Sequence, residues 1–131
     1  MSFTTRTSNK FVIEGSLIGL NEYTNLNREN AYIANKTKQT IQYMIYLYIR
    51  KHRVAPVKDY PIMLKIDWYE KDNRRDVDNI VFAKKFILDA LVESGIIKND
   101  SRKYVKGFID NVYTDRENPR VEVEICTTQQ N

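Results

Sequence analysis

The sequence has 131 residues, a length that fits one domain spanning residues 1–131, and its 42% hydrophobic content is ordinary for a water-soluble protein. Its single cysteine, Cys126, excludes a disulfide within the chain and a zinc site built from cysteines. The net charge of +4 and the isoelectric point of about 9.1 favour association with polyanions such as nucleic acids, without being diagnostic.

The sequence shows neither a membrane span nor a secretion signal. Its longest apolar run, from Tyr43 to Ile49, has seven residues, whereas a bilayer span needs roughly 20. The segment from Met1 to Arg6 lacks the apolar core of a signal peptide. We therefore expect a cytoplasmic protein.

The first half of the chain predicts one strand and one long helix. Phe11 to Ile18 has the apolar spacing of a strand, whereas the asparagine-rich segment from Gly19 to Asn30 is expected to be a loop. From Ala31 to Arg53 apolar side chains recur at helical spacing, and the basic residues at the end suit a helix C-terminus. His52, the only histidine, belongs to this basic cluster, so we expect no metal or base role for it.

The next segment predicts a strand followed by a second helix. Ile62 to Tyr69 alternates apolar and polar side chains, as a half-buried strand does. A helix is expected from Asn79 to Ser94, with Asp78 as its N-cap and Gly95 as its stop.

Two more strands complete the chain, from Val105 to Tyr113 and from Arg120 to Cys126. The segment from Asp115 to Pro119 is expected to be their hairpin loop, and the tail from Thr127 to Asn131 is expected to be frayed. The order β-α-β-α-β-β indicates an α+β domain, with a mixed sheet of about four strands and two main helices packed on it.

The first candidate for chemistry is a pair of aspartates, Asp76 and Asp78, between a charged turn and the start of the second helix. In extended backbone, side chains two residues apart point the same way. Two carboxylates aimed at one point repel each other unless a cation lies between them. A small set of oxygen ligands suits Mg²⁺, with Mn²⁺ as a substitute, so the pair indicates a divalent-metal site.

The same pair also has a purely structural interpretation. Asp78 could cap the helix, and Asp76 could form a surface ion pair with Arg74 or Arg75. For an arbitrary Asp-x-Asp pair this is the more common situation, so the pair alone is a weak signal.

Three further residues favour the metal hypothesis. Asp100 follows the same helix, and Lys84 and Lys85 lie on it. Three carboxylates and a lysine are a common set for phosphodiester hydrolysis. The carboxylates hold a metal that makes a bound water more acidic, and the lysine stabilises the developing negative charge.

This region resembles the RusA family of Holliday junction resolvases. The matching stretches are Arg75 to Asn79, Phe86 to Leu91, Gly95, and Asn99 with Asp100. They fit a family pattern of Asp-x-Asp-Asn, a lysine-containing helix ending in Asp-x-Leu, a glycine and a further aspartate. The resemblance implies a RusA-like fold and an endonuclease that resolves four-way DNA junctions by symmetric phosphodiester hydrolysis in DNA recombination and repair.

Carried over by position, Asp76, Asp78 and Asp100 correspond to the metal-binding carboxylates of the family. Asn21 corresponds to an asparagine near the N-terminal strand of the family. The resemblance thus implies a Mg²⁺ site built on the three aspartates.

The position of the catalytic lysine depends on where the count begins. Counting back from Asp89 gives Lys85, whereas counting forward from Asp78 gives Phe82, which cannot serve. The chain therefore resembles a branch of the family whose helix start is three residues longer. Lys85 is the expected catalytic lysine, and Lys84 remains the alternative.

The resemblance also implies a homodimer, and helix length gives a separate reason to expect one. A helix from Asn79 to Ser94 is about 24 Å long, whereas the stretch from Gly95 to Asp100 spans about 17 Å when fully extended. Asp100 would then fall short of Asp78 in one chain unless the chain ran directly back. We expect Asp100 to complete a composite site with a second subunit, with action in its own chain as the alternative.

Lys71, Arg74 and Arg75 flank the carboxylate pair. Together with Lys84 and Asn21, they are candidates for contacts with DNA beside the cleaved bond, although a solvated charged turn would have the same composition. The alternative to a junction-resolving enzyme is a less selective or non-catalytic protein that binds branched DNA.

Overall fold

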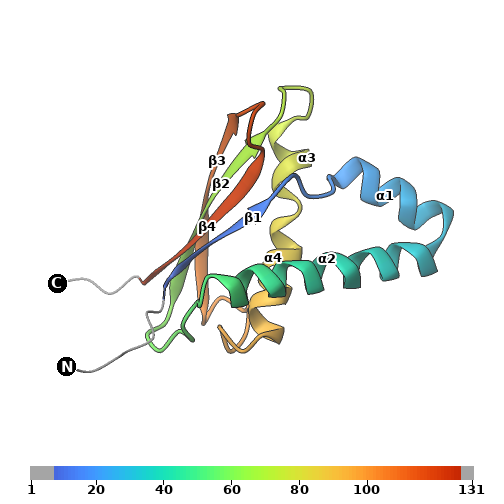
Figure 1. Cartoon of the computed structure of the whole chain (residues 1–131). Coiled ribbons are helices and arrows are strands. Elements are labelled where there is room, and N and C mark those ends of the chain that lie inside the picture. Colours follow the sequence, from blue (N-terminus) through green and yellow to red (C-terminus); the bar gives the residue numbers. More distant parts are fainter. Residues whose placement is uncertain (1–7, 128–131) are drawn as a thin grey trace.

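The computed structural model describes residues 8–127, which form a four-stranded sheet with all of their helices on one face (Figure 1). In chain order the elements are β1 (Lys10–Glu14), α1 (Leu20–Glu29), α2 (Ala31–Lys51), β2 (Ile62–Glu70), α3 (Val77–Val81), α4 (Lys84–Glu93), β3 (Val105–Thr114) and β4 (Arg120–Thr127). The α+β class and the mixed four-stranded sheet are confirmed. The predicted order was coarser than the observed one, because α1 precedes α2 and the second helical segment is divided into α3 and α4.

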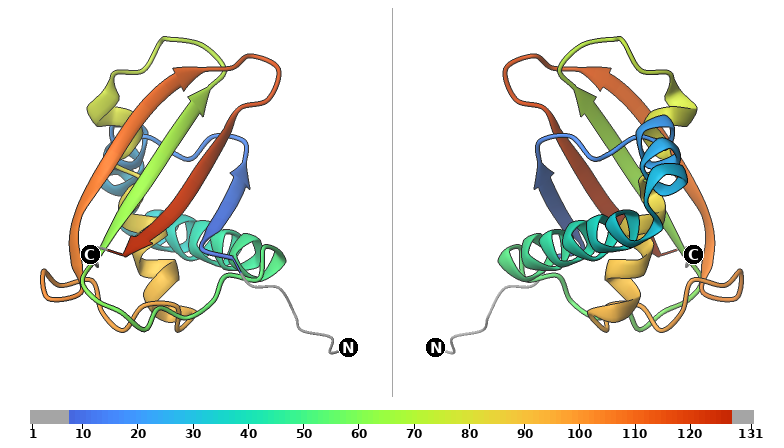
Figure 2. Two further views of the ribbon diagram at one scale, coloured as in Figure 1. Left: turned by 90° about the vertical axis from the view of Figure 1, so that its left-hand side faces the viewer. Right: turned by 90° about the vertical axis from the view of Figure 1, so that its right-hand side faces the viewer.

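The strands are ordered β1-β4-β2-β3 across the sheet, as the left view of Figure 2 shows. β2 and β3 are parallel and are joined through α3 and α4, whereas β4 runs antiparallel to both β1 and β2. A parallel pair needs such a crossover, which carries the chain from one end of the sheet back to the other. The β2–α3 turn therefore lies at the opposite end of the sheet from the segment between α4 and β3 (Figure 1).

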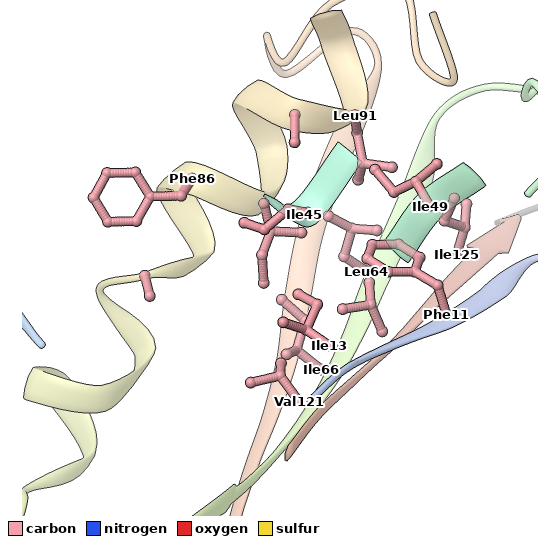
Figure 3. Close-up of a cluster of buried hydrophobic side chains, with 14 of the residues drawn as sticks. Phe11, Ile13, Ile45, Ile49, Leu64, Ile66, Phe86, Leu91, Val121 and Ile125 are labelled. Atoms are coloured by element: carbon pink, nitrogen blue, oxygen red, sulfur yellow. The ribbon is translucent and has the colours of Figure 1, made fainter. Parts of the chain in front are cut away.

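The core lies between the sheet and the helices. β2 buries every second side chain, namely Ile62, Leu64, Ile66, Trp68 and Glu70. Figure 3 shows Ile45 and Ile49 of α2 together with Leu91 of α4 in the same cluster as Leu64 and Ile66. The two-residue period of β2 is thus the direct result of a sheet covered on one face.

Shortening a side chain in this core should lower stability substantially. Ile66 is 0% exposed, so we expect Ile66→Ala to reduce the free energy of unfolding by about 2–5 kcal/mol through lost burial and a residual cavity. The measurement is urea denaturation. The matched control is Ile33→Ala, because Ile33 is 43% exposed and its truncation should change stability by no more than about 0.5 kcal/mol.

The helix expected from Ala31 to Arg53 is confirmed as α2, which begins after Asn30 and ends at Lys51. The Asn30 side chain caps it by accepting a hydrogen bond from the backbone N–H of Ile33 at 3.1 Å. Gly95 is confirmed as the stop after α4, with a φ of +81° that favours glycine.

Two predictions for the N-terminal region are wrong. The expected loop from Gly19 to Asn30 is mostly the helix α1, which packs through Tyr23 against the rings of Phe82 and Phe86, at centroid distances of 5.7 and 5.5 Å. The first strand ends at Glu14 rather than Ile18, because Gly15 turns the chain with a φ of +87°.

Two predictions for the C-terminal half are also wrong. The expected single helix from Asn79 to Ser94 is interrupted after Val81, so that α3 and α4 are separate helices. The segment from Asp115 to Pro119 is not a hairpin loop, because β3 and β4 lie on opposite sides of β2. Each strand pairs with β2 instead of with the other.

No helix within residues 8–127 combines the length and the apolar character needed to cross a membrane. Of the tail that was expected to be frayed, Thr127 is the last residue of β4, and residues 128–131 lie outside the described part.

Candidate active site

The candidate carboxylates lie on the connection between β2 and α3. Asp76 is the N-cap residue of α3, with extended backbone (φ −72°, ψ 159°), and its carbonyl accepts hydrogen bonds from the N–H groups of Asn79 and Ile80 at 3.1 Å each. Asp78 lies in the first turn of α3. The expectation of extended backbone through the pair is therefore wrong, because the helix already begins at Val77.

Both carboxylates are exposed, and within residues 8–127 neither side chain has a hydrogen-bond or ion-pair partner. The predicted cap role of Asp78 is wrong, because Asp76 occupies the N-cap position of α3. The side chain of Asp76 makes no capping hydrogen bond either. The neighbouring arginines are engaged elsewhere, Arg74 with Asp72 and Arg75 with a buried glutamate. The interpretation as a cap and a surface ion pair accounts for neither carboxylate.

Arg75, expected to contact DNA, is bound within its own chain. Its Nε and Nη2 donate to the two carboxylate oxygens of Glu70 at 3.0 Å each, and its Nη1 donates to the carbonyl of Leu17 at 3.1 Å. The side chain of Glu70 is only 8% exposed. This two-point contact is the strong geometry for an arginine and a carboxylate.

The connection between β1 and α1 packs directly on this turn. The backbone N–H of Asn21 donates to Oδ1 of Asn79 at 2.9 Å, while the residue itself is exposed at the start of α1. A Cβ added to Gly19 would come within 2.7 Å of both Arg75 Nη1 and Asn79 Oδ1. Glycine at position 19 is what allows so close an approach.

The two candidate lysines at the start of α4 have different surroundings. Lys84 is partly buried, with its Nζ 2.5 Å from Oδ2 of Asp110 and 4.4 Å from the ring centre of Phe108. The other oxygen of Asp110 accepts a hydrogen bond from Nε1 of Trp68 at 2.9 Å. Lys85 is exposed, and no contact ties its ammonium group to the described part of the chain.

Asp100 is exposed in the segment between α4 and β3. This segment joins the start of β2, where the Ile62 N–H donates to the Tyr104 carbonyl at 2.8 Å, whereas Asp76 follows the other end of that strand. A strand rises about 3.3 Å per residue, which separates the ends of the nine-residue β2 by about 26 Å. Accordingly, no group of three histidine, cysteine or carboxylate side chains able to hold a metal forms within residues 8–127 of one chain.

Basic residues border the β2–α3 turn. The lining of one cleft of about 470 Å³ includes Lys71, Arg74 and Arg75, together with the acidic residues Glu22, Glu70 and Asp72. A second cleft of about 540 Å³ is lined by Lys71, Asp72, Asn73, Arg74 and Arg116. Arg116 belongs to the connection between β3 and β4. Its position in the same cleft as Lys71 and Arg74 therefore depends on the strand order and could not be predicted from the local sequence. In the same connection, a hydrogen bond from Arg120 lowers the pKa of the Asp115 carboxyl below its usual range.

Glu70 and Asp110 were not identified as site residues from the sequence. Glu70 had a visible signal, since it continues the inward-facing positions of β2 and a buried acid needs a partner. Asp110 had none, because its contact with Lys84 depends on β3 lying beside β2.

Comparison with known proteins identifies the family. The sequence model of the family described as endodeoxyribonuclease RusA matches residues 19–126, which include the β2–α3 turn, both lysines and Asp100. A search of curated proteins finds no match. The chain therefore belongs to the RusA family of endodeoxyribonucleases, which resolve Holliday junctions.

Proposed function

We propose that this protein resolves four-way DNA junctions with Mg²⁺ held at a site built on Asp76 and Asp78. The observation that carries the proposal is the pair of exposed carboxylates that have no partner within residues 8–127 of a RusA-family chain. Two neighbouring negative charges repel each other, and a divalent cation between them removes that repulsion. Oxygen ligands of this kind fit Mg²⁺, and also Mn²⁺.

The residues of the β2–α3 connection would have different roles at this site. Asp76 and Asp78 would hold the ion, which supplies an acidified water and positive charge at the phosphate. Lys71 and Arg74, both exposed on the same connection, would bind phosphates on either side of the cleaved bond. Such contacts fix the orientation of the DNA but carry no sequence information.

A homodimer would complete the carboxylate set. Asp100 lies at the far end of the sheet from Asp76 in the same chain, so Asp100 would reach the pair from another subunit. A two-fold axis would create two equivalent composite sites, each with Asp76 and Asp78 from one subunit and Asp100 from its partner. Two such sites match a junction in which two strands of like polarity are cut.

Lys85 is the proposed catalytic lysine, and the surroundings of the two lysines provide a test. Lys84 compensates the partly buried carboxylate of Asp110, so we expect Lys84→Ala to lower the free energy of unfolding by about 1–3 kcal/mol. We expect Lys85→Ala to leave stability within about 0.5 kcal/mol but to lower kcat at least about a hundredfold. Thermal denaturation and single-turnover cleavage measure the two effects, and a Lys85→Ala enzyme with normal kcat would contradict this assignment.

Cleavage of a synthetic junction tests the proposed function. The purified protein is incubated with a four-way junction and with linear duplex of the same sequence, in Mg²⁺ and in EDTA. We expect nicking of the junction in Mg²⁺ and none in EDTA. Binding without cleavage in Mg²⁺ and Mn²⁺ would identify a non-catalytic junction-binding protein, and equal cutting of the duplex would identify a less selective nuclease. No binding to the junction at low salt would overturn both the junction-resolving function and the junction-binding alternative.

A further inference from the structure

We propose that the free edge of β3 is the contact between two copies of this chain, which pair antiparallel with Ile109 on the two-fold axis. The inference rests on the proposed function, because it specifies the surface that would bring Asp100 of one subunit to the carboxylate pair of the other. Two copies of β3 that pair in this way extend the sheet from four strands to eight.

β3 is a long edge strand with one side unpaired. It is the outer strand of the sheet, and within residues 8–127 it pairs only with β2 (left view of Figure 2). It has ten residues and no proline, and its register on β2 is unbroken from Gly107 to Thr114. The opposite edge strand, β1, has only five residues and begins and ends with the charged Lys10 and Glu14. Long, unprotected edges readily pair with another strand, so β3 is the edge suited to a partner.

Apolar side chains are exposed along this edge. Apart from those on α1 and α2, the large apolar side chains exposed within residues 8–127 are Val77, Ile109 and Tyr113. Ile109 and Tyr113 lie on β3 and are each 45% exposed. Val77 belongs to α3, which lies beside the end of β3 at the free edge (left view of Figure 2). Ile109 is near the middle of β3, so a two-fold axis at this residue lets the two strands overlap over most of their length.

The open face of the sheet is less suited to a second copy. β2 and β4 form the middle of the sheet and bury alternate side chains toward the helices. Their other side chains on the open face include Lys65, Asp67, Glu122 and Glu124. Packing two such faces together would take these charges out of water, which is costly. Edge pairing leaves the charged face in water and gives backbone hydrogen bonds to the unpaired side of β3.

Antiparallel pairing brings opposite ends of the two sheets together. With Ile109 opposite its own copy, Val105 lies opposite Tyr113 of the partner subunit. In each chain Tyr113 is the register neighbour of Tyr69, near the end of β2 from which the carboxylate turn continues. Asp100 shortly precedes β3, and Asp76 shortly follows β2. Asp100 of one subunit and Asp76 of the partner subunit therefore extend from the same end of the combined sheet.

This arrangement replaces a long separation by a short one. In one chain the two ends of β2 are about 26 Å apart. Between subunits, β3 of one copy is two strand spacings from β2 of the other, or about 10 Å. The stretch from Asp100 to Val105 spans up to about 17 Å, enough to bring Asp100 to the carboxylate pair of the partner. The same contact would cover Val77.

Disulfide trapping tests the edge and its register. In a Cys126→Ser background, which removes the single native cysteine, Ile109→Cys places two thiols opposite each other at the axis. Directly opposite residues of antiparallel strands have Cα atoms about 5 Å apart, a separation that a disulfide bridges. We expect mild oxidation to shift most of this variant to twice its mass on a denaturing gel without reductant.

Two control variants in the same background define the geometry. Tyr113→Cys lies on the same strand and is equally exposed, but its two copies would be about 26 Å apart along the strands. Lys65→Cys lies beside Ile109 on the open face, and its two copies would be three strand spacings apart, or about 14 Å. We expect a disulfide in neither. Cross-linking through Lys65→Cys or Tyr113→Cys, with none through Ile109→Cys, would overturn the proposed contact.

Ile109→Lys tests whether the contact completes the site. Two like charges would meet at the axis, so we expect the dimer Kd, measured by analytical ultracentrifugation, to rise at least about 10-fold. Without Asp100 of the partner subunit, Mn²⁺ binding in the absence of DNA should weaken by about 10-fold or more at a protein concentration where the wild type is dimeric. The matched control is Leu47→Lys on α2, because Leu47 is 48% exposed. That variant should keep the wild-type dimer and Mn²⁺ affinity.

The contact and the proposed function can fail separately. A covalent Ile109→Cys dimer that cuts no junction in Mg²⁺ would refute the proposed function and still support the edge contact. If the wild type cuts junctions but Ile109→Cys forms no covalent dimer, the edge contact is overturned. It is also overturned if Ile109→Lys keeps the wild-type dimer Kd and Mn²⁺ affinity. If Ile109→Lys does not fold, the result of the disulfide experiment decides.

Discussion

Asp76→Asn should abolish junction cleavage while leaving junction binding intact. Residues that merely support a metal ligand typically contribute 10–100-fold, so loss of a direct ligand should lower single-turnover cleavage by more than about a hundredfold. The substitution keeps the shape of the side chain and removes one of two neighbouring charges. Because the Asp76 side chain is exposed and has no partner within residues 8–127, stability should change by no more than about 0.5 kcal/mol.

The matched control for this prediction is Glu29→Gln. Glu29 is also exposed and is the last residue of α1, on none of the segments that carry Asp76, Asp78 or Asp100. This control removes the same charge from the protein without touching the proposed site, so its cleavage rate should equal that of the wild type. A similar loss of cleavage in both variants would show that net charge, rather than a metal ligand, had been tested.

Inactive Asp76→Asn and Asp100→Asn subunits should regain cleavage when they are combined by co-expression. In a mixed dimer with composite sites, one site carries both substitutions and the other carries neither. If subunits pair at random, about half of the dimers are mixed and each has one intact site, so about a quarter of the wild-type sites are recovered. Since only one strand can then be cut, the product should be a nicked junction rather than two resolved duplexes.

The control for this experiment pairs Asp76→Asn with a subunit carrying both substitutions. No dimer in that mixture has an intact composite site, so cleavage should stay at the background level. If Asp100 acts within its own chain, neither mixture regains cleavage, and the trans arrangement is wrong.

The long, one-sided elements of the fold could be predicted from the sequence. β2 was expected from Ile62 to Tyr69 and runs to Glu70, and α2 was expected from Ala31 to Arg53 and ends at Lys51. In both, burial of one face imposes a regular spacing of apolar side chains, which is visible in any single sequence.

Prediction from the sequence failed where contacts between residues far apart in the chain determine the structure. α1 has no buried residue, and its polar composition resembles that of a loop. It is stabilised through Tyr23, which packs on aromatic rings more than fifty positions further along the chain. The hairpin predicted between β3 and β4 was wrong for a similar reason. The residues of the connecting turn do not indicate that both strands pair with β2.

The candidate site was predictable only in part. The spacing of Asp76 and Asp78 and the family pattern pointed to the β2–α3 turn, and the structure adds that both carboxylates lack a partner in the described chain. The different surroundings of Lys84 and Lys85 could not be predicted from the sequence, because Asp110, the partner of Lys84, comes from β3. The structure adds that Arg75, a candidate DNA contact, also binds Glu70 and the carbonyl of Leu17 within the protein.

Strand mapping of a cleaved junction tests the central claim most directly. Each of the four strands of an immobile junction is end-labelled in turn, and the wild-type protein is supplied with Mg²⁺. We expect nicks in two strands of like polarity at symmetric positions, with 5′-phosphate ends, and no product in EDTA or with Asp76→Asn. Cleavage that persists in EDTA or in the Asp76→Asn protein would contradict a metal-dependent site at this turn.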